Sequence, residues 1–216
     1  MADSLFRKIL ITICTLAIFC TGAYCYESSF PFPFEFGHSS DIYLNVKKPT
    51  KKQNADIQKA NEILKERKIS RSPDEIIKYI KKDEAEKIKL LINAGMDPNG
   101  TLFVNVPVYY AAKFNSFNTL KVLLDNGAKP EDSISSPLRE ALKRNHVECA
   151  RLLVENGANV NYYDGMTDEN VLYTALKNNH FELAKLMIEK GAQMDKKSYT
   201  IIKKKKLDKK YGLYVD

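Results

Sequence analysis

Apolar residues recur at helical spacing in four stretches of the chain, and each stretch stops at a glycine. In the clearest of them, Val147 and Ala150 precede the apolar run 152–154, which gives the i, i+3, i+4 pattern of a helix with one buried side. Gly157 follows, and a glycine here is typical of a helix end, because the residue after the last turn often takes a left-handed conformation. The same pattern predicts three further helices, which end at Gly95, Gly127 and Gly191.

A second, shorter helix is predicted before each of these helices. Pro107 and Pro137 stand twenty residues before Gly127 and Gly157, and each begins a motif of an apolar residue, two variable residues and an alanine. Proline suits the first turn of a helix, and alanine lets two helices approach closely. The four glycines are 32, 30 and 34 residues apart. A nearly fixed period of this length indicates a stack of repeated two-helix units.

The repeated segments resemble the T-P-L-H-x-A signature of the ankyrin repeat. The resemblance lies in residues 106–112, 136–142 and 170–176, although none of them has the histidine, and the first copy, at Glu75 to Ile80, keeps only the apolar spacing. An atypical terminal repeat is expected where a stack meets water or a cap. The resemblance covers about residues 72–195 and implies an all-α fold, an ankyrin-repeat solenoid of stacked helix-turn-helix units with hairpin-like loops. Its four repeats are expected at about residues 71–99, 105–131, 135–161 and 169–195.

The first 23 residues have the pattern of a secretory signal peptide. Arg7 and Lys8 precede an apolar run of 12 residues from Ile9 to Cys20, and the small residues 21–23 suit a signal peptidase. A helix that spans a bilayer needs about 20 apolar residues. The sequence therefore predicts export, either to a periplasm or out of the cell. An uncleaved segment that anchors the protein in a membrane is the alternative.

The segments that flank the array have separate predicted roles. Residues 24–53 are interpreted as a linker rich in proline and aromatic residues. Three interpretations of its aromatic part stay open: packing on a flank of the array, binding a partner as a strand, or disorder. Residues 54–70 are predicted to form a helix that caps the first repeat, because their apolar residues lie on one side. Residues 196–216 are interpreted as a lysine-rich C-terminal cap or tail.

The net charge of +7 comes almost entirely from the C-terminal segment. Residues 196–216 hold eight lysines against two aspartates, whereas residues 24–195 balance to about zero. A basic pI of this origin does not indicate a nucleic-acid-binding fold, and no nucleic acid is expected as a partner. Two interpretations stay open for the C-terminal lysines: a solvated cap that keeps the end of the array soluble, or a weak attraction to an anionic membrane surface or an acidic partner. The lysines in question are Lys203, Lys204, Lys205 and Lys206.

No catalytic residue, metal site or cofactor is predicted, so the protein is not expected to be an enzyme. The sequence has no glycine-rich phosphate loop, paired-cysteine zinc motif or nucleophile elbow. His146 and His180 occupy the same position of two repeats, which holds them too far apart to share one ion. Cys149 fits helix packing, and a disulfide with Cys25 stays open. Asn99 begins an Asn-Gly-Thr glycosylation pattern, which a turn at the repeat boundary explains adequately.

Mapping the repeat onto the predicted first helices identifies a candidate surface for a partner. Of twelve outward positions, seven are basic and one, Glu140, is acidic, and the second repeat adds two aromatic residues one turn apart. The lysines either only solvate the helices or line a groove for an acidic partner, and the apolar loop tips either contact the partner or pack onto neighbouring repeats. The predicted contact residues are Lys78, Lys81, Lys82, Tyr110, Lys113, Phe114, Lys143, Arg144, Lys177, Phe103, Tyr162 and Tyr163.

The residues and the resemblance together lead to one functional prediction. The resemblance implies that the array binds another protein through its concave face and loop tips. We therefore expect an exported, non-enzymatic protein–protein interaction module whose partner carries an acidic surface. The alternative is a membrane-associated scaffold, held by an uncleaved N-terminal signal or by the polybasic tail.

Overall fold

A computed structural model describes residues 51–132 and 134–211 of the chain. The predicted signal peptide, the linker up to residue 50 and the last five residues lie outside the described residues. The elements are α2 (Lys51–Glu66), α3 (Pro73–Lys81), α4 (Ala85–Asn93), α5 (Pro107–Phe114), α6 (Phe117–Asp125), α7 (Pro137–Lys143), α8 (Val147–Glu155), β1 (Tyr163–Asp164), β2 (Glu169–Asn170), α9 (Val171–Lys177), α10 (Phe181–Glu189), α11 (Lys196–Lys205) and α12 (Leu207–Tyr211).

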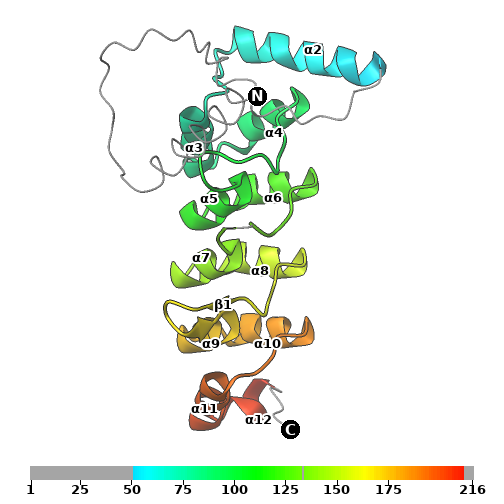
Figure 1. Cartoon of the computed structure of the whole chain (residues 1–216). Helices are drawn as coiled ribbons and strands as arrows, with labels where there is room; N and C mark the ends of the chain where they lie inside the picture. Colours follow the sequence, from blue (N-terminus) through cyan, green and yellow to red (C-terminus); the bar gives the residue numbers. More distant parts are fainter. Residues whose placement is uncertain (1–50, 133, 212–216) are drawn as a thin grey trace, which may run out of the picture. The chain divides into compact units, whose positions relative to one another are not determined.

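The helices are arranged as pairs that stack one on the next (Figure 1). The first helices of the pairs, α3, α5, α7, α9 and α11, pack against one another in series. The second helices, α4, α6, α8, α10 and α12, form another series beside them. Helix α2 packs against α4 and begins the second series. The all-α ankyrin-type stack expected from the sequence is confirmed, with four complete helix pairs followed by the shorter pair α11 and α12.

Each pair is built by the same local rules. Ser72, Ser136 and Asn170 precede α3, α7 and α9, and their side chains accept hydrogen bonds from the amides of Glu75, Arg139 and Tyr173, respectively. Such N-caps satisfy backbone donors that a helix leaves unpaired in its first turn. The turn between the two helices then needs one left-handed residue. This residue is Asp83, Asn115, Asn145 or Asn179, with φ between 54° and 66°. Asparagine and aspartate adopt that conformation more readily than most residues.

The core lies between the two series of helices. Ala111, Ala141 and Ala175 are fully buried on the first helices, and Leu123, Leu153 and Met187 are fully buried on the second. Small alanine side chains on the first helices let the second helices lie close, which is how the sequence motif works. Tyr79 takes the alanine position in the first repeat, in keeping with its atypical sequence. After each second helix the chain turns at a glycine, and Gly157 has φ +87° as the sequence predicts.

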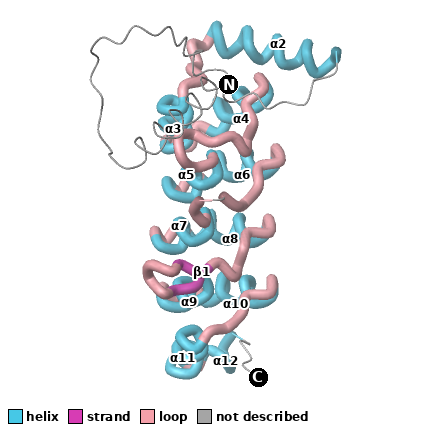
Figure 2. The backbone as a smooth tube through the Cα atoms, in the orientation of Figure 1, coloured by secondary structure: helices cyan, strands magenta, loops and turns pink. Residues whose placement is uncertain are grey.

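Neighbouring repeats are joined through the loops that follow these glycines (Figure 2). The side-chain amide of Asn99 donates to the Gly127 carbonyl at 3.0 Å and accepts from the Lys129 amide at 2.8 Å. Asn161 makes the same two bonds two boundaries further on, at 3.0 Å to the Gly191 carbonyl and 2.7 Å from the Gln193 amide. Asn99 therefore serves the stack directly, beyond the local turn that the sequence predicts at this position.

A carboxylate also ties the first repeat to the second. Asp83 accepts hydrogen bonds from the Asn118 amide at 3.2 Å and from the Thr119 amide at 2.7 Å. These amides belong to the first turn of α6, whose own N-cap residue, Ser116, makes no side-chain capping bond. Ser116 donates instead to the Ile80 carbonyl at 2.5 Å. The exchange of caps between repeats couples the stability of each pair to that of its neighbour.

The two ends of the array differ from the expected boundaries. The N-terminal helix ends at Glu66, not near residue 70, because Lys68 takes a positive φ of 53° and turns the chain toward α3. Residues 196–211 are helical, so this part of the C-terminal segment is a truncated fifth helix pair. Ile202 and Leu207 are buried in it, and Lys206 takes the left-handed position between its helices, with φ 52°.

Candidate partner-binding surface

Four lysines occupy the same place on consecutive first helices. Lys81, Lys113, Lys143 and Lys177 each stand two residues before the left-handed turn residue of their repeat, and we call them the lysine row. Because α3, α5, α7 and α9 pack in series, the row runs from one repeat to the next. Lys113 is half-exposed and the other three are exposed. The sequence prediction that basic side chains recur at one outward position is correct for these residues.

The members of the row differ in their ion pairs. Lys177 contacts Glu169 at 2.7 Å, and the hydrogen bond from this lysine to the carboxylate raises the pKa of Lys177. Within the described part of the chain, no carboxylate lies within ion-pairing distance of Lys81, Lys113 or Lys143. The positive charge of the row is therefore uncompensated over the first three repeats and neutralised at the fourth.

An aromatic patch lies beside the row in the second repeat. The rings of Tyr110 and Phe114 stack at a centroid distance of 6.4 Å and an interplanar angle of 18°, and Tyr109 meets Tyr110 edge-on at 5.6 Å. The Nζ atoms of Lys81 and Lys113 lie 5.8 and 5.7 Å from the centroid of the Phe114 ring. Tyr110 is fixed further, because its hydroxyl donates to the Leu102 carbonyl at 2.9 Å. The patch offers rigid aromatic area next to cations, a combination frequent at interface hot spots.

The loop before α9 forms the short hairpin β1–β2, which carries the acids that neutralise the C-terminal part of the surface. Asp164 accepts from the Thr167 hydroxyl at 2.6 Å and pairs with Arg139 of α7, and these contacts lower its pKa, the Thr167 bond most strongly. Asp168 pairs with Lys197 of α11 at 2.6 Å, which lowers the pKa of Asp168 and raises that of Lys197. With Glu169 on Lys177, the hairpin is held by three cationic side chains from three different repeats.

Apolar side chains project from the loop tips of three consecutive repeats. Phe103, Ile134 and Met166 are 61%, 61% and 92% exposed. Ile134 and Met166 are presented in the same way, because the amide of each donates at 3.1 Å to the aspartate two residues earlier. The sequence prediction found Phe103 but not Val104, Ile134 or Met166. An aspartate two residues before an apolar residue was the signal available for the last two.

The remaining aromatic loop residues divide into two groups. Tyr163 is exposed, and its hydroxyl donates to Asp168, which raises the pKa of Tyr163. Tyr162 is half-buried and packs against the core. Tyr162 is therefore partly covered by the array, whereas Phe103 and Tyr163 face solvent.

The other predicted contact residues differ in how available they are for a partner. Lys78 pairs with Glu75 at 2.6 Å, and Lys82 is exposed at the end of α3. Arg144 pairs with Glu140 at 2.5 Å. Glu140 is only 8% exposed, so its assignment to the outward positions was wrong. The guanidinium of Arg144 lies over the carboxylate one turn earlier on the helix, a pairing that four-residue spacing allows.

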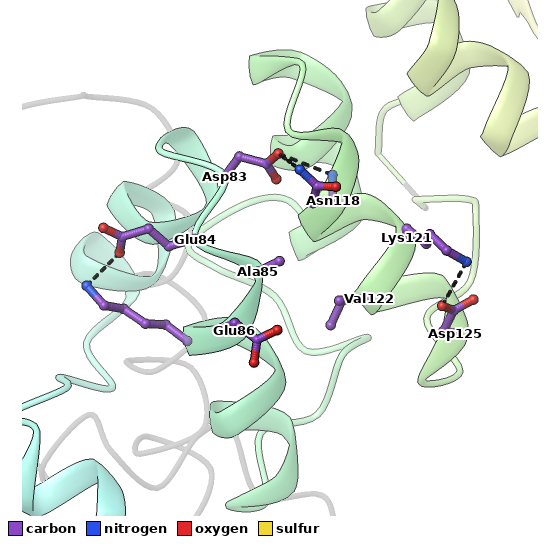
Figure 3. A pocket seen from close by; sticks show the side chains of 9 residues that line it. Asp83, Glu84, Ala85, Glu86, Asn118, Lys121, Val122 and Asp125 are labelled. Carbon is purple, nitrogen blue, oxygen red and sulfur yellow. Dashed lines mark hydrogen bonds and ion pairs between the residues drawn. The ribbon is translucent and has the colours of Figure 1, made fainter.

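An open depression of about 620 Å³ lies on the other series of helices, between α4 and α6 (Figure 3). Apart from Glu86, its charged groups have structural partners: Asp83 caps α6, Glu84 pairs with Lys87 at 2.7 Å, and Lys121 pairs with Asp125 at 3.1 Å. A depression of about 540 Å³ with Asn115 and His146 on its wall lies at the equivalent place one repeat on. Because these depressions recur with the repeat, we interpret them as grooves between stacked helices.

The residues considered for chemistry have structural roles. His146 Nδ1 lies 2.9 Å from the Ala112 carbonyl of the preceding repeat. Burial lowers the pKa of His180 and raises that of the fully buried Cys149 to about 11. In residues 51–132 and 134–211, no three His, Cys, Asp or Glu side chains gather closely enough to hold a metal ion. Over the same residues, no helix is long and apolar enough to cross a membrane.

The architecture is that of a helical-repeat protein. Hydrogen bonds from the loops join its neighbouring repeats, and its surface residues recur at the same position of each repeat. Residues 109–198 match the family model described as ankyrin repeats, in three copies. This part of the chain is therefore similar to ankyrin repeats, as the sequence motifs implied. The first repeat lies outside the matched residues, in agreement with its partial signature. Ankyrin repeats generally mediate protein–protein interaction and are typically non-enzymatic.

Curated relatives match the chain over part of its length. The chain is 33% identical over 86 residues to dynein axonemal heavy chain 12 of Bos taurus, covering 35% of this chain and 24% of the relative. It is 32% identical over 80 residues to putative ankyrin repeat protein FPV014 of Fowlpox virus (strain NVSL), covering 34% and 18%. It is 33% identical over 86 residues to ankyrin repeat and SOCS box protein 14 of Mus musculus, covering 35% and 15%. The chain thus spans no more than 24% of the length of these relatives.

Proposed function

We propose that this protein is an exported, non-enzymatic binding module. Its basic surface binds an acidic surface of a partner protein. The contact is the first three members of the lysine row, Lys81, Lys113 and Lys143, together with the aromatic patch. One observation carries the proposal: these lysines are uncompensated on three successive repeats, whereas the fourth position of the row already has a carboxylate on it. Repetition at one position distinguishes this surface from a general excess of lysine.

The loop tips extend the same surface. Leu102 is buried, and its carbonyl accepts the hydrogen bond from the Tyr110 hydroxyl, which places the first loop tip next to the patch. The exposed apolar residues of the three tips offer apolar area beside the charged row. A partner with acidic residues flanked by apolar ones fits both parts, because electrostatic attraction speeds association and buried apolar area holds the complex.

Export is supported by the N-terminal residues 1–23, whose basic start, short apolar run and small final residues follow the secretory pattern. The membrane-associated alternative keeps the same segment uncleaved. Intact mass of the purified protein, together with cell fractionation, separates the two. A mature protein that lacks residues 1–23 in a soluble fraction supports export, and an intact chain in the membrane fraction contradicts it.

Charge reversal tests the binding surface. In the first variant, Lys81, Lys113 and Lys143 are all changed to glutamate. In the matched control, three exposed lysines on or next to the second helices are changed in the same way: Lys89, Lys185 and Lys190. Both variants change the net charge equally, so only the position of the charge differs.

The measurement is association with partners captured from the cell that exports the protein, at several salt concentrations. The row variant is expected to associate more slowly and to lose most of the salt dependence, because charge attraction is screened over about 8 Å at physiological ionic strength. The control is expected to behave like the unmodified protein. Equal effects of both variants, or no effect of either, would show that the row is only a solvated face.

A further inference from the structure

The hairpin β1–β2 shows how an acidic segment occupies the lysine row. Lys177 is the fourth member of the row, and Glu169, which pairs with it at 2.7 Å, belongs to the extended strand β2. The chain thus contains one example, built into the fold, of a carboxylate from extended backbone seated on a row lysine. Lys81, Lys113 and Lys143 present the same ammonium group at the same place on the three preceding helices.

The spacing of the row follows from helix packing. The first helices contact one another in series, and packed helices lie about 8–10 Å apart. Successive row lysines are therefore separated by roughly the same distance. A polyproline II segment advances about 3.1 Å per residue, so its residues i, i+3 and i+6 lie on one face about 9 Å apart. The spacing of the row lysines and the three-residue advance of a polyproline II segment therefore differ by less than the reach of a lysine side chain.

From these observations we propose that the occupant of the surface is an extended acidic segment of another protein with a carboxylate at every third residue. Its three carboxylates pair with Lys81, Lys113 and Lys143. The inference rests on the proposed function and specifies its partner. The bound segment ends before Lys177, because Glu169 of the hairpin already pairs with that lysine.

The character of the cations supports a carboxylate segment. All four positions of the row are lysine, and none is arginine. Lysine binds as a compact point charge, whereas arginine is the residue favoured for bidentate recognition of phosphate in nucleic acids. Among the described residues, the carboxylate that pairs with the row is that of Glu169. The ring of Phe114 lies within 5.8 Å of the Nζ atoms of both Lys81 and Lys113, so it can pack against an apolar or proline residue between two acids.

Two peptides of the same composition test the register. Both have nine residues, six prolines and three glutamates, with blocked termini; in one the glutamates occupy positions 2, 5 and 8, and in the other positions 4, 5 and 6. In a polyproline II helix three adjacent residues point in three directions, so the second peptide can set only one glutamate on the row. Binding to the full-length protein is measured by NMR titration at low ionic strength, with a nine-nucleotide thymidine oligonucleotide as a third probe.

The spaced peptide is expected to bind about tenfold more tightly than the adjacent one, because exposed ion pairs are individually weak and only the spaced peptide makes three. The preference is expected to vanish in the variant that carries glutamate at Lys81, Lys113 and Lys143. Equal binding of the two peptides, failure of both to bind, or equally tight binding of the oligonucleotide would overturn the inference. The proposed function survives any of these results if a captured partner still depends on the three lysines, and fails separately if it does not.

Discussion

Replacement of Glu131 by asparagine is expected to stabilise the array. Glu131 stands where Asn99 and Asn161 stand at the other two boundaries, and it accepts a hydrogen bond from the Asn159 amide. Asn99 and Asn161 accept the equivalent bond and also donate to the carbonyl of the next glycine, at 3.0 Å in both cases. A carboxylate has no proton to donate to that carbonyl, which here belongs to Gly157.

The expected gain follows from one added hydrogen bond. A typical intramolecular hydrogen bond contributes about 1 kcal/mol net, and for a domain of this size that corresponds to a rise in Tm of roughly 2–4 °C. Burial also raises the pKa of Glu131, so its ionised form is disfavoured in the folded state. A carboxyl group whose folded pKa is raised stabilises the fold when protonated, and that contribution is lost as the pH rises through the folded pKa. The advantage of asparagine should therefore be larger at pH 7 than in acid.

Thermal and urea unfolding, followed by circular dichroism at pH 7 and at pH 4, measure the effect. The reverse change, Asn161→Asp, removes the donor at the next boundary and is expected to lower Tm by a similar amount. Glu131→Gln removes the charge without adopting the asparagine geometry and separates the two contributions. If Glu131→Asn leaves Tm unchanged or lowers it while Asn161→Asp is harmless, the side-chain bridges between repeats do not stabilise the stack as argued.

Three further outcomes are expected. Gly157→Val should lower the free energy of unfolding by more than about 1 kcal/mol, because φ is +87° at Gly157, although an added Cβ would meet nothing within 4 Å. Gly165 does not have that conformation, so Gly165→Ala should lower it little. Equal melting temperatures of the two variants would contradict this. Cys149, buried and with its pKa raised to about 11, should resist alkylation at pH 8 in the folded protein, and mass mapping of a labelled Cys149 would refute its burial. Hydrogen exchange should be slower in 141–154 than in 76–91, because the latter segment belongs to the terminal repeat; the opposite order would contradict the coupling of repeats.

The repeat architecture could be predicted because its determinants are local. Gly157 and its equivalents, the prolines that start α5 and α7, and the alanines of the first helices each act within one unit, so their spacing alone indicates the stack. The same logic placed Lys81, Lys113, Lys143 and Lys177 in one row. A feature that depends only on the period of the helix and the period of the repeat can be found without knowing any contact.

Features that depend on loop folding, on side-chain placement or on contacts between units could not be predicted. The pairing of Lys177 with Glu169 requires the loop before α9 to fold back as a hairpin, and the burial of Glu140 requires Arg144 to turn over it. The exposure of Ile134 and Met166 is set by aspartates whose other oxygens are held by neighbouring repeats, at the Val106 amide and at Arg139. The contacts of the two aspartates involve neighbouring repeats, whereas the other two pairs lie within one repeat and depend on how a loop or a side chain is placed. The period of the repeat gives neither kind of information.

Site-specific photo-crosslinking shows whether the lysine row contacts the partner. A photoreactive amino acid is placed at position 113, in the lysine row, or at position 185, an exposed lysine on the second helix α10. The exported protein is then irradiated together with its captured partner. The account predicts a crosslinked partner from position 113 and none from position 185, with the crosslink on the partner mapping to an acidic segment. A crosslink from position 185 alone, or one from position 113 to a segment without acidic residues, would contradict it.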